Sequence, residues 1–394
     1  MLTATKDRPL ATTITGSLPR PRWFVANLGG RPFRAAIGGD LAYREQYCDA
    51  VATLIADQTR AGLDIVSDGE MRFDMDAAGR SWMGYVFDRL EGLGHGDMRP
   101  LGIRPGMQRG FGEPGHILHD FLETKMPPLI IGPIGPGTLQ YDSVWKLAQR
   151  LTERAVKMGG CSAQLVETHV VSQSPTNPYN DRHAALMAFA DALNEEYHRL
   201  ADAGCAIIQV EEPCLHYAAD VGWEIPVETY VEAFNREVRG LRAKTELWCH
   251  SCWGNPLAQR VQLHASYRPA LPWFDRLDAD VLTFETAEND GAELAEIAAA
   301  IGKDKKICIG VVSHRALQVE TPEQVAALIR KALKHIAPER LILSSDCGFG
   351  RQGMSRTHAF YKMVAIARGT NIVRRELGLP EAPVRAAEPR YALI

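Results

Sequence analysis

The sequence predicts an α/β protein, specifically a (β/α)8 TIM barrel with a long insertion after the second strand. Short, continuous apolar runs recur along the 394-residue chain and alternate with amphipathic stretches. Such runs are typical of parallel strands covered on both faces, and their spacing of roughly 30–40 residues in the C-terminal half is that of a βα unit. An open doubly wound sheet is the alternative, but no G-x-G-x-x-G turn follows the first strands.

Eight apolar runs supply the expected barrel strands. In chain order we place these strands at residues 12–15, 63–67, 163–166, 206–210, 247–250, 281–284, 307–312 and 341–344. Residues 181–202 and 322–336 have the amphipathic pattern of helices that cover a barrel. A ninth run at 129–131 lies inside the insertion, where we expect an accessory hairpin. No linker or low-complexity tract divides the chain, so we expect one catalytic domain over residues 1–394.

Composition and charge exclude several classes of protein. Hydrophobic residues make up 46% of the chain and charged residues 23%, which is ordinary for a globular protein and argues against disorder. The net charge of −4 leaves no basic excess for phosphates, so we expect no nucleic-acid partner. No apolar run reaches the length of about 18 residues that a membrane span needs. The first residues lack the apolar segment of a secretory signal, and we therefore expect a cytoplasmic protein.

Ionisable side chains follow the apolar runs at the points where the expected strands end. Because reactive groups of such barrels gather at the carboxyl ends of the strands, these side chains should converge on one face. They are Glu70, Glu211, His250, Cys252, Glu285, His314 and Cys347. The chain has eight cysteines, but without an export signal or compact even spacing they do not form a disulfide framework. Buried thiols and metal ligands remain as explanations.

His250, Cys252, Glu285 and Cys347 together predict a metal site. Side chains two apart on a strand point the same way, so His250 and Cys252 can bind one ion. One imidazole, two thiolates and one carboxylate suit tetrahedral zinc, whereas magnesium and calcium prefer oxygen. An H-x-C pair alone is more often core packing. Cys347, in a D-C-G sequence at a different strand end, shifts the interpretation to metal.

The kind of metal site indicates the kind of reaction. A zinc ion with several protein sulfurs activates water poorly, but it lowers the pKa of a thiol that binds to it and leaves that thiolate nucleophilic. An incoming thiol could displace a labile carboxylate ligand. The pattern therefore indicates alkyl transfer onto a thiol. A hydrolase is less well supported, because neither G-x-S-x-G nor H-E-x-x-H occurs.

At these residues the sequence resembles the catalytic barrel of cobalamin-independent methionine synthases, and especially the short relatives without an N-terminal barrel. The resemblance covers nearly the whole chain. It rests on T-T-x-x-G-S-x-P at 12–19, a strand ending in G-E at 63–70, I-I-Q-x-E-E-P at 207–213, H-x-C at 250–252, F-E at 284–285 and D-C-G at 346–348. The resemblance implies that His250, Cys252, Glu285 and Cys347 bind the catalytic zinc, and that a zinc-bound thiolate takes up a methyl group, with homocysteine giving methionine.

The resemblance also implies substrate-binding and catalytic roles. Gly16 and Ser17 match the loop that holds the homocysteine carboxylate, and Glu70 matches a glutamate that contacts homocysteine. Glu211 stands where methionine synthases have an aspartate for the substrate amino group. His314 matches the general-acid histidine that follows the seventh strand of the family.

Departures from the family pattern concern the methyl donor and leave two alternatives. The tryptophan that stacks on folate is missing from residues 166–169, and the arginine-rich folate segment is reduced to residues 125–128. We therefore expect a donor other than free methyl-folate, such as a corrinoid protein or another activated alkyl group. The C-W-G-N sequence at 252–255 is also similar to epoxyalkane:coenzyme M transferases, so a thiol–epoxide transferase is one alternative. A non-catalytic, zinc-containing binding protein is the other.

Overall fold

The barrel is formed by eight parallel strands within the part of the chain that the structure describes. This computed structural model describes residues 2–28, 40–72, 81–94, 128–170, 176–211, 213–222, 224–254, 265–350 and 354–387. The sheet has the order β1-β10-β9-β8-β7-β6-β5-β2. Its strands are β1 (Ala11–Thr12), β2 (Val66–Ser67), β5 (Val156–Cys161), β6 (Ile207–Glu211), β7 (Glu246–Ser251), β8 (Val281–Phe284), β9 (Lys306–Val312) and β10 (Leu341–Ser345).

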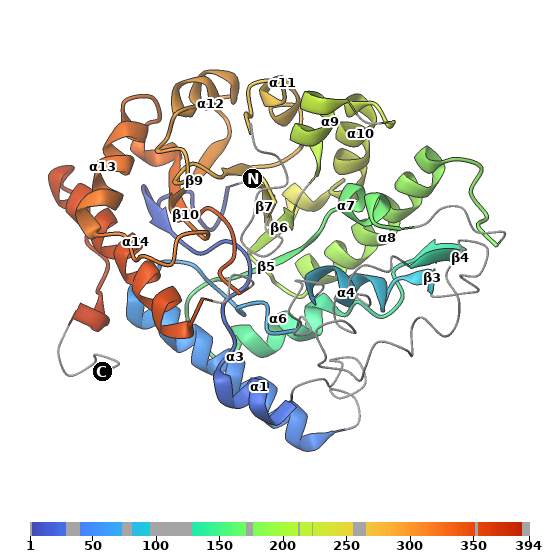
Figure 1. Cartoon of the computed structure of the whole chain (residues 1–394), viewed down its shortest axis with the longest axis horizontal. Helices are drawn as coiled ribbons and strands as arrows, with labels where there is room; N and C mark the ends of the chain where they lie inside the picture. Colours follow the sequence, from blue (N-terminus) through green and yellow to red (C-terminus); the bar gives the residue numbers. More distant parts are fainter. Residues whose placement is uncertain are drawn as a thin grey trace.

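Strands that follow one another in the chain are neighbours around the barrel, as a TIM barrel requires. The two ends of the sheet meet because the amides of Asp64 and Ile65 both donate to the Thr12 carbonyl at 3.0 Å. Helices surround the strands (Figure 1). The longer ones are α3 (Leu41–Ala61), α6 (Tyr141–Gln149), α8 (Arg182–Asp202), α10 (Val227–Glu237), α13 (Pro322–Leu333) and α14 (Arg356–Glu376). The predicted fold is therefore confirmed.

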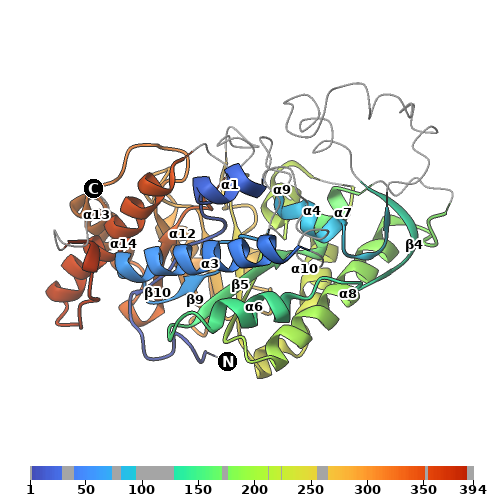
Figure 2. The same ribbon diagram turned by 90° about the horizontal axis from the view of Figure 1, so that it is seen from below.

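Short helices mark the rim at the carboxyl ends of the strands. These rim helices are α1 (Arg22–Leu28), α4 (Ser81–Phe87), α7 (Ala163–Thr168) and α9 (Leu215–Val221). Two further short helices, α11 (Leu271–Phe274) and α12 (Leu294–Ala300), come later in the chain. Figure 2 shows α1, α4, α7 and α9 along one side of the barrel, with the N-terminus on the other. Among the described helices, none combines the length and the apolar character that crossing a membrane requires.

The insertion after β2 carries the expected hairpin. Strands β3 (Glu91–Gly94) and β4 (Leu129–Gly135) pair antiparallel as a separate two-stranded sheet. The pair lies outside the ring of barrel strands, at the right of Figure 1. The apolar run at 129–131 is thus an accessory strand, as its place between the second and third barrel strands predicts.

The prediction of the third barrel strand is wrong. Residues 163–166 belong to helix α7, and the strand is β5, which ends at Cys161. Two glycines weaken the strand pattern of β5, yet the packing demands them: a Cβ on Gly159 would lie 2.8 Å from Glu211 Oε1, and one on Gly160 2.6 Å from the Tyr197 hydroxyl. Ser162 then caps α7, because its Oγ accepts a hydrogen bond from the Leu165 amide at 3.1 Å.

An apolar layer fills the amino-terminal end of the barrel interior. Six strands, and the residue directly before β2, each contribute one fully buried side chain to this layer: Ala11, Ile65, Ile207, Trp248, Val281, Cys308 and Ile342. In β5, Lys157 is paired in register with Ile207, and its Nζ lies 4.9 Å from the centre of the Trp248 ring. Because apolar side chains occupy this end, the polar groups farther along the strands gather at the carboxyl-terminal face.

Candidate metal centre

Two thiols and one imidazole meet at the carboxyl ends of β7 and β10. His250 is the penultimate residue of β7, Cys252 directly follows that strand, and Cys347 lies two residues beyond β10. One donor atom from each residue lies within 4.8 Å of the others. The two sulfur atoms are 3.7 Å apart, and His250 and Cys252 are almost fully buried. The structure thus assembles three of the four predicted metal ligands.

The electrostatics of this cluster favour a thiolate. The Cys252 thiol donates to Cys347 Sγ and His250 lies nearby, and together they outweigh burial and lower the pKa of Cys347 to about 6. Deprotonated sulfur and imidazole nitrogen are the donors that zinc prefers in proteins. By its donor chemistry and the closeness of its atoms, the cluster of His250, Cys252 and Cys347 fits a zinc ion.

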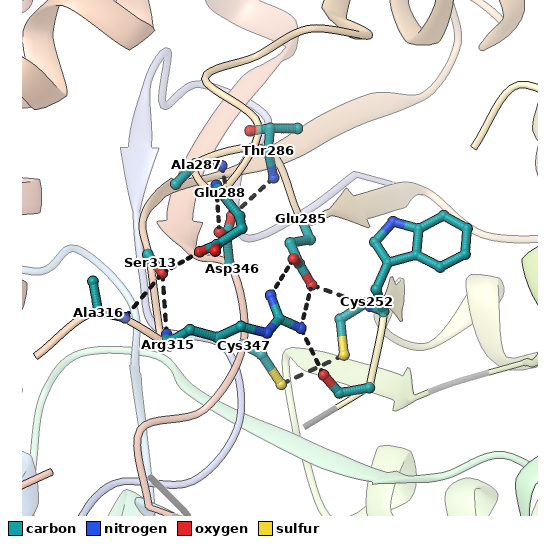
Figure 3. Close-up of polar contacts among 12 residues, drawn as sticks. Cys252, Glu285, Thr286, Ala287, Glu288, Ser313, Arg315, Ala316, Asp346 and Cys347 are labelled. Atoms are coloured by element: carbon teal, nitrogen blue, oxygen red, sulfur yellow. Dashed lines mark hydrogen bonds and ion pairs between the residues drawn. The ribbon is translucent and has the colours of Figure 1, made fainter. Parts of the chain in front are cut away.

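The carboxylate of Glu285, the fourth predicted ligand, is hydrogen-bonded to Trp253 and Arg315. Glu285 directly follows β8, and its carboxylate accepts hydrogen bonds from the Trp253 amide at 3.1 Å and from Arg315 Nη2 at 3.2 Å. Arg315 Nη1 makes a second contact with the same carboxylate (Figure 3). Glu285 is not in the group of donor atoms that lie within 4.8 Å of one another. Its role as a metal ligand therefore stays a prediction.

Three residues to which the sequence analysis assigned no role hold the cluster in place. Asp346 Oδ1 accepts from the amides of Thr286 and Ala287 at 2.8 Å, and Oδ2 accepts from the Glu288 amide at 3.0 Å (Figure 3). This carboxylate ties the end of β10, which carries Cys347, to the loop after Glu285. Arg315, which binds Glu285, is the second of the three.

His216 is the third of these residues, and it holds the backbone of Cys252 in place. Its Nε2 lies 2.6 Å from the Cys252 carbonyl oxygen, so this nitrogen carries the proton and donates. Burial lowers the pKa of His216 to about 3, which keeps the ring neutral. The ring packs against Trp253, with the two ring centroids 4.7 Å apart. A buried histidine in a short helix has no sequence signature that would have distinguished it from core packing.

The predicted carboxylate-binding loop lies directly beside the Cys347 segment. Gly16 has a φ of +70°, and a Cβ there would lie 2.8 Å from the backbone of Gly348. The Ser17 carbonyl accepts from the amides of Phe349 and Gly350 at 2.7 and 3.0 Å. Only glycine combines this left-handed conformation with such a close approach. Gly16 and Ser17 are therefore held next to one of the cluster's cysteines.

The predicted substrate-binding carboxylates, Glu70 and Glu211, converge on one point of β5. A Cβ on Gly159 would lie 2.8 Å from Glu211 Oε1 and 3.5 Å from Glu70 Oε1. Both side chains are more than nine-tenths buried. Glu211 Oε2 also lies 3.5 Å from His250 Nδ1, which connects this pair of carboxylates to the thiol–imidazole cluster. Two buried carboxylates beside a cluster of two thiols and an imidazole suit a ligand that carries an ammonium group.

Glu211 is held in its charged form by a buried polar chain. Lys157 Nζ donates to Gln209 Oε1 at 2.7 Å, and Gln209 Nε2 donates to Glu211 Oε1 at 2.8 Å. Burial alone would raise the pKa of Glu211, but His250, Gln209 and Lys157 together hold it below its ordinary value. The carboxylate is therefore negative at neutral pH.

His314, the predicted general acid, lies two residues beyond the end of β9. The structure buries it completely, between Ser313 and Arg315 in the chain. Its neighbour Arg315 reaches Glu285, so the segment that carries His314 borders the candidate site. A role for His314 in proton transfer stays a prediction.

The fold and the site define a class: a TIM barrel whose strand ends present a zinc-type set of imidazole and thiol donors. The chain belongs to the cobalamin-independent synthase family, since the model of that family's catalytic domain matches residues 119–369. Methionine synthases of Saccharolobus solfataricus and Sulfurisphaera tokodaii are 28% and 27% identical to this chain. Both matches cover 93% of this chain, and they cover 96% and 94% of those proteins.

Solved structures show the same fold. A B12-independent methionine synthase from Shewanella sp. W3-18-1, solved in complex with selenomethionine, superposes with a TM-score of 0.70 at 23% identity and covers 94% of this chain and 99% of that one. A methyltransferase from Methanosarcina mazei gives a TM-score of 0.52 at 12% identity over 91% of this chain and 94% of its own. These structures confirm the fold, and the match to the family's catalytic-domain model confirms the family resemblance that the motifs predict.

Proposed function

We propose that this protein transfers a methyl group to a small thiol, with homocysteine as the first candidate and methionine as the product. Membership of the cobalamin-independent synthase family and similarity to methionine synthases over 93% of the chain support the proposal. The observation that carries it is the position of the Glu70 and Glu211 carboxylates beside the cluster of His250, Cys252 and Cys347. An ammonium site next to a thiol site matches an amino acid that carries a thiol.

Zinc is the proposed cofactor, and His250, Cys252 and Cys347 would hold it. A zinc ion bound there would lower the pKa of the substrate thiol and keep its sulfur nucleophilic. In the overall reaction the sulfur forms a bond to the methyl carbon, the bond from that carbon to the donor breaks, and the thiol proton is released. Asp346 and His216 keep the cysteine-bearing segments in place while this occurs.

The chain's own residues orient the substrate. Glu70 and Glu211, both buried, would accept hydrogen bonds from the substrate ammonium group. The loop of Gly16 and Ser17, pressed against the segment after Cys347, would receive the substrate carboxylate. His314 would donate or accept the proton that the leaving donor or the thiol requires.

The methyl donor is the second part of the proposal. We expect a donor other than free methyl-folate, since residues 166–169 contain no tryptophan for stacking. The family to which the chain belongs is described as cobalamin-independent, which gives a corrinoid donor no support. Residues 125–127, the reduced folate segment, lie outside the described part of the chain.

The test is a product assay with zinc-loaded protein and homocysteine. Methyl-tetrahydrofolate and methylcobalamin are supplied in parallel with a deuterated methyl group, and deuterated methionine is measured by mass spectrometry. We expect labelled methionine with one of these donors and none with the Glu70→Gln/Glu211→Gln double variant. Labelled product from a thiol without an amino group, but none from homocysteine, would refute the assignment of substrate. Thioether formation from an epoxide alone would favour the epoxide transferase.

A further inference from the structure

Arg315 makes a two-pronged contact with a carboxylate at the candidate metal centre. Its two terminal nitrogens contact the two oxygens of Glu285, and Nη2 also donates to the Gly254 carbonyl at 2.7 Å. The Arg315 side chain is 9% exposed and that of Glu285 is 1% exposed. In a charge pair this deeply buried each group depends on the other, because leaving either charge alone there would be strongly unfavourable.

The guanidinium of Arg315 faces the two thiols as well as the carboxylate. Figure 3 shows it beside Glu285, on the side where the sulfur atoms of Cys252 and Cys347 lie. Burial alone would lower the pKa of Arg315, and Glu285, Cys252 and Cys347 together raise it. Glu285 itself is bound by the amide of Trp253, the residue directly after Cys252. The carboxylate thus lies within reach of both the arginine and the cysteine-bearing segment.

A fixed turn presents Arg315 to this position. Ser313 Oγ accepts from the amides of Arg315 and Ala316 at 3.0 and 3.3 Å. The same hydroxyl donates to Glu288 Oε2 at 2.6 Å, which joins the turn to the loop that follows Glu285 (Figure 3). Hydrogen bonds through Ser313 therefore connect the segment that carries Arg315 to the segment that carries Glu285. The backbone holds the two side chains of the pair near each other.

We propose that Arg315 is a positioning residue that competes with the bound metal for the Glu285 carboxylate and so keeps one place at the site available to the thiol. Two cysteine thiolates, a substrate thiolate and a carboxylate together carry four negative charges, twice the charge of a zinc ion. Arg315 supplies a positive charge that offsets the carboxylate when it is away from the metal. This inference rests on the proposed function, in which a thiol joins the site.

The test measures zinc affinity without any turnover, by competition with a chromophoric chelator in thiol-free buffer. Arg315→Met removes the group that competes for the Glu285 carboxylate, so zinc should bind more tightly. Contacts to metal ligands affect metal affinity by about tenfold or more, and we therefore expect a tightening of about tenfold relative to wild type. Glu285→Gln removes the shared carboxylate, so adding Arg315→Met to it should change the affinity less than about twofold. Arg356→Met is the matched control, since Arg356 binds Asp57 through two nitrogens between α14 and α3. It should leave zinc affinity unchanged.

The outcomes distinguish an Arg315 that competes with zinc for the Glu285 carboxylate from an Arg315 that only stabilises the fold. Weaker zinc binding by Arg315→Met, or an equal change with and without Glu285→Gln, would show that Arg315 only stabilises the fold and would overturn the inference. Should Arg315→Met fail to fold, Arg315→Lys replaces it, because lysine keeps the charge without the fork; tightening smaller than tenfold supports competition, and weakening contradicts it. Absence of zinc binding in wild type would instead refute the proposed cofactor, and with it the proposed function.

Discussion

Cys252 Sγ and Cys347 Sγ lie 3.7 Å apart although 95 positions separate the two residues in the chain. The barrel produces this contact, because β7 and β10 both end on the same face and both cysteines follow their strands. Two sulfur atoms at this distance, with His250 beside them, suit a shared metal ion.

Replacing one of these sulfurs should remove the metal and leave the fold. We expect Cys347→Ser to bind zinc at least about tenfold more weakly, since zinc prefers thiolate to hydroxyl. Plasma mass spectrometry of purified protein measures the zinc, and far-ultraviolet circular dichroism measures the fold. Cys205→Ala is the control, because Cys205 is also buried but is not in the metal-ligand group. Full zinc content in Cys347→Ser would contradict the site, and unfolding would point to a structural metal.

Glu211 should recognise the amino group of the substrate. A hydrogen bond to a charged partner contributes about 1.5–3 kcal/mol, so Glu211→Gln should raise the KM for homocysteine about tenfold or more. The measurement compares homocysteine with 4-mercaptobutyrate, which has the same thiol and carboxylate but no amino group. The KM for 4-mercaptobutyrate should be nearly unchanged. An equal rise for both thiols would mean that Glu211 acts through His250 and not on the substrate.

Asp346 should stabilise the fold even without metal. Its carboxylate accepts three backbone hydrogen bonds from residues 286–288, and an amide in its place would turn an NH2 group toward at least one of these donors. We expect Asp346→Asn to lower the free energy of unfolding by about 2–4 kcal/mol, measured with urea in the presence of a chelator. Asp290→Asn, at an exposed pair with Lys331, should change it by less than about 0.5 kcal/mol. Equal effects of the two substitutions would contradict this role of Asp346.

Lys157 should make stability depend on pH above neutrality. Burial lowers its pKa from 10.5 to about 8 in the folded protein. Between these values the unfolded chain holds a proton that the folded protein has released, so stability from this group rises with pH. Relative to Lys157→Met, wild type should gain stability from pH 8 to pH 10.5. Urea unfolding of both proteins at these pH values checks this, and a constant difference would contradict the lowered pKa.

The sequence predicts the residues of the metal cluster better than the residues that hold this cluster in place. His250, Cys252 and Cys347 are recognisable because their residue types are rare together and stand at strand ends. The third strand is missed because Gly159 and Gly160 replace the usual apolar residues to make room for Glu211 and Tyr197. A one-dimensional pattern cannot show such a close approach.

The supporting residues could not be predicted, because their contacts join distant parts of the chain. Asp346 binds amides 58 to 60 positions away, and His216 binds the Cys252 carbonyl 36 positions away. Arg315 reaches Glu285, 30 positions earlier, only because β8 and β9 are neighbours in the barrel. Each is an ordinary polar residue in the sequence, and only the folded barrel gives it a partner.

X-ray absorption at the zinc edge, recorded with and without homocysteine, tests the central claim most directly. The account predicts a zinc ion with two sulfur neighbours and at least one imidazole nitrogen in the protein alone, from Cys252, Cys347 and His250. Adding homocysteine should increase the sulfur neighbours to three. Protein that takes up no zinc, or a sulfur count that stays at two when homocysteine is saturating, would contradict a thiol-activating zinc site.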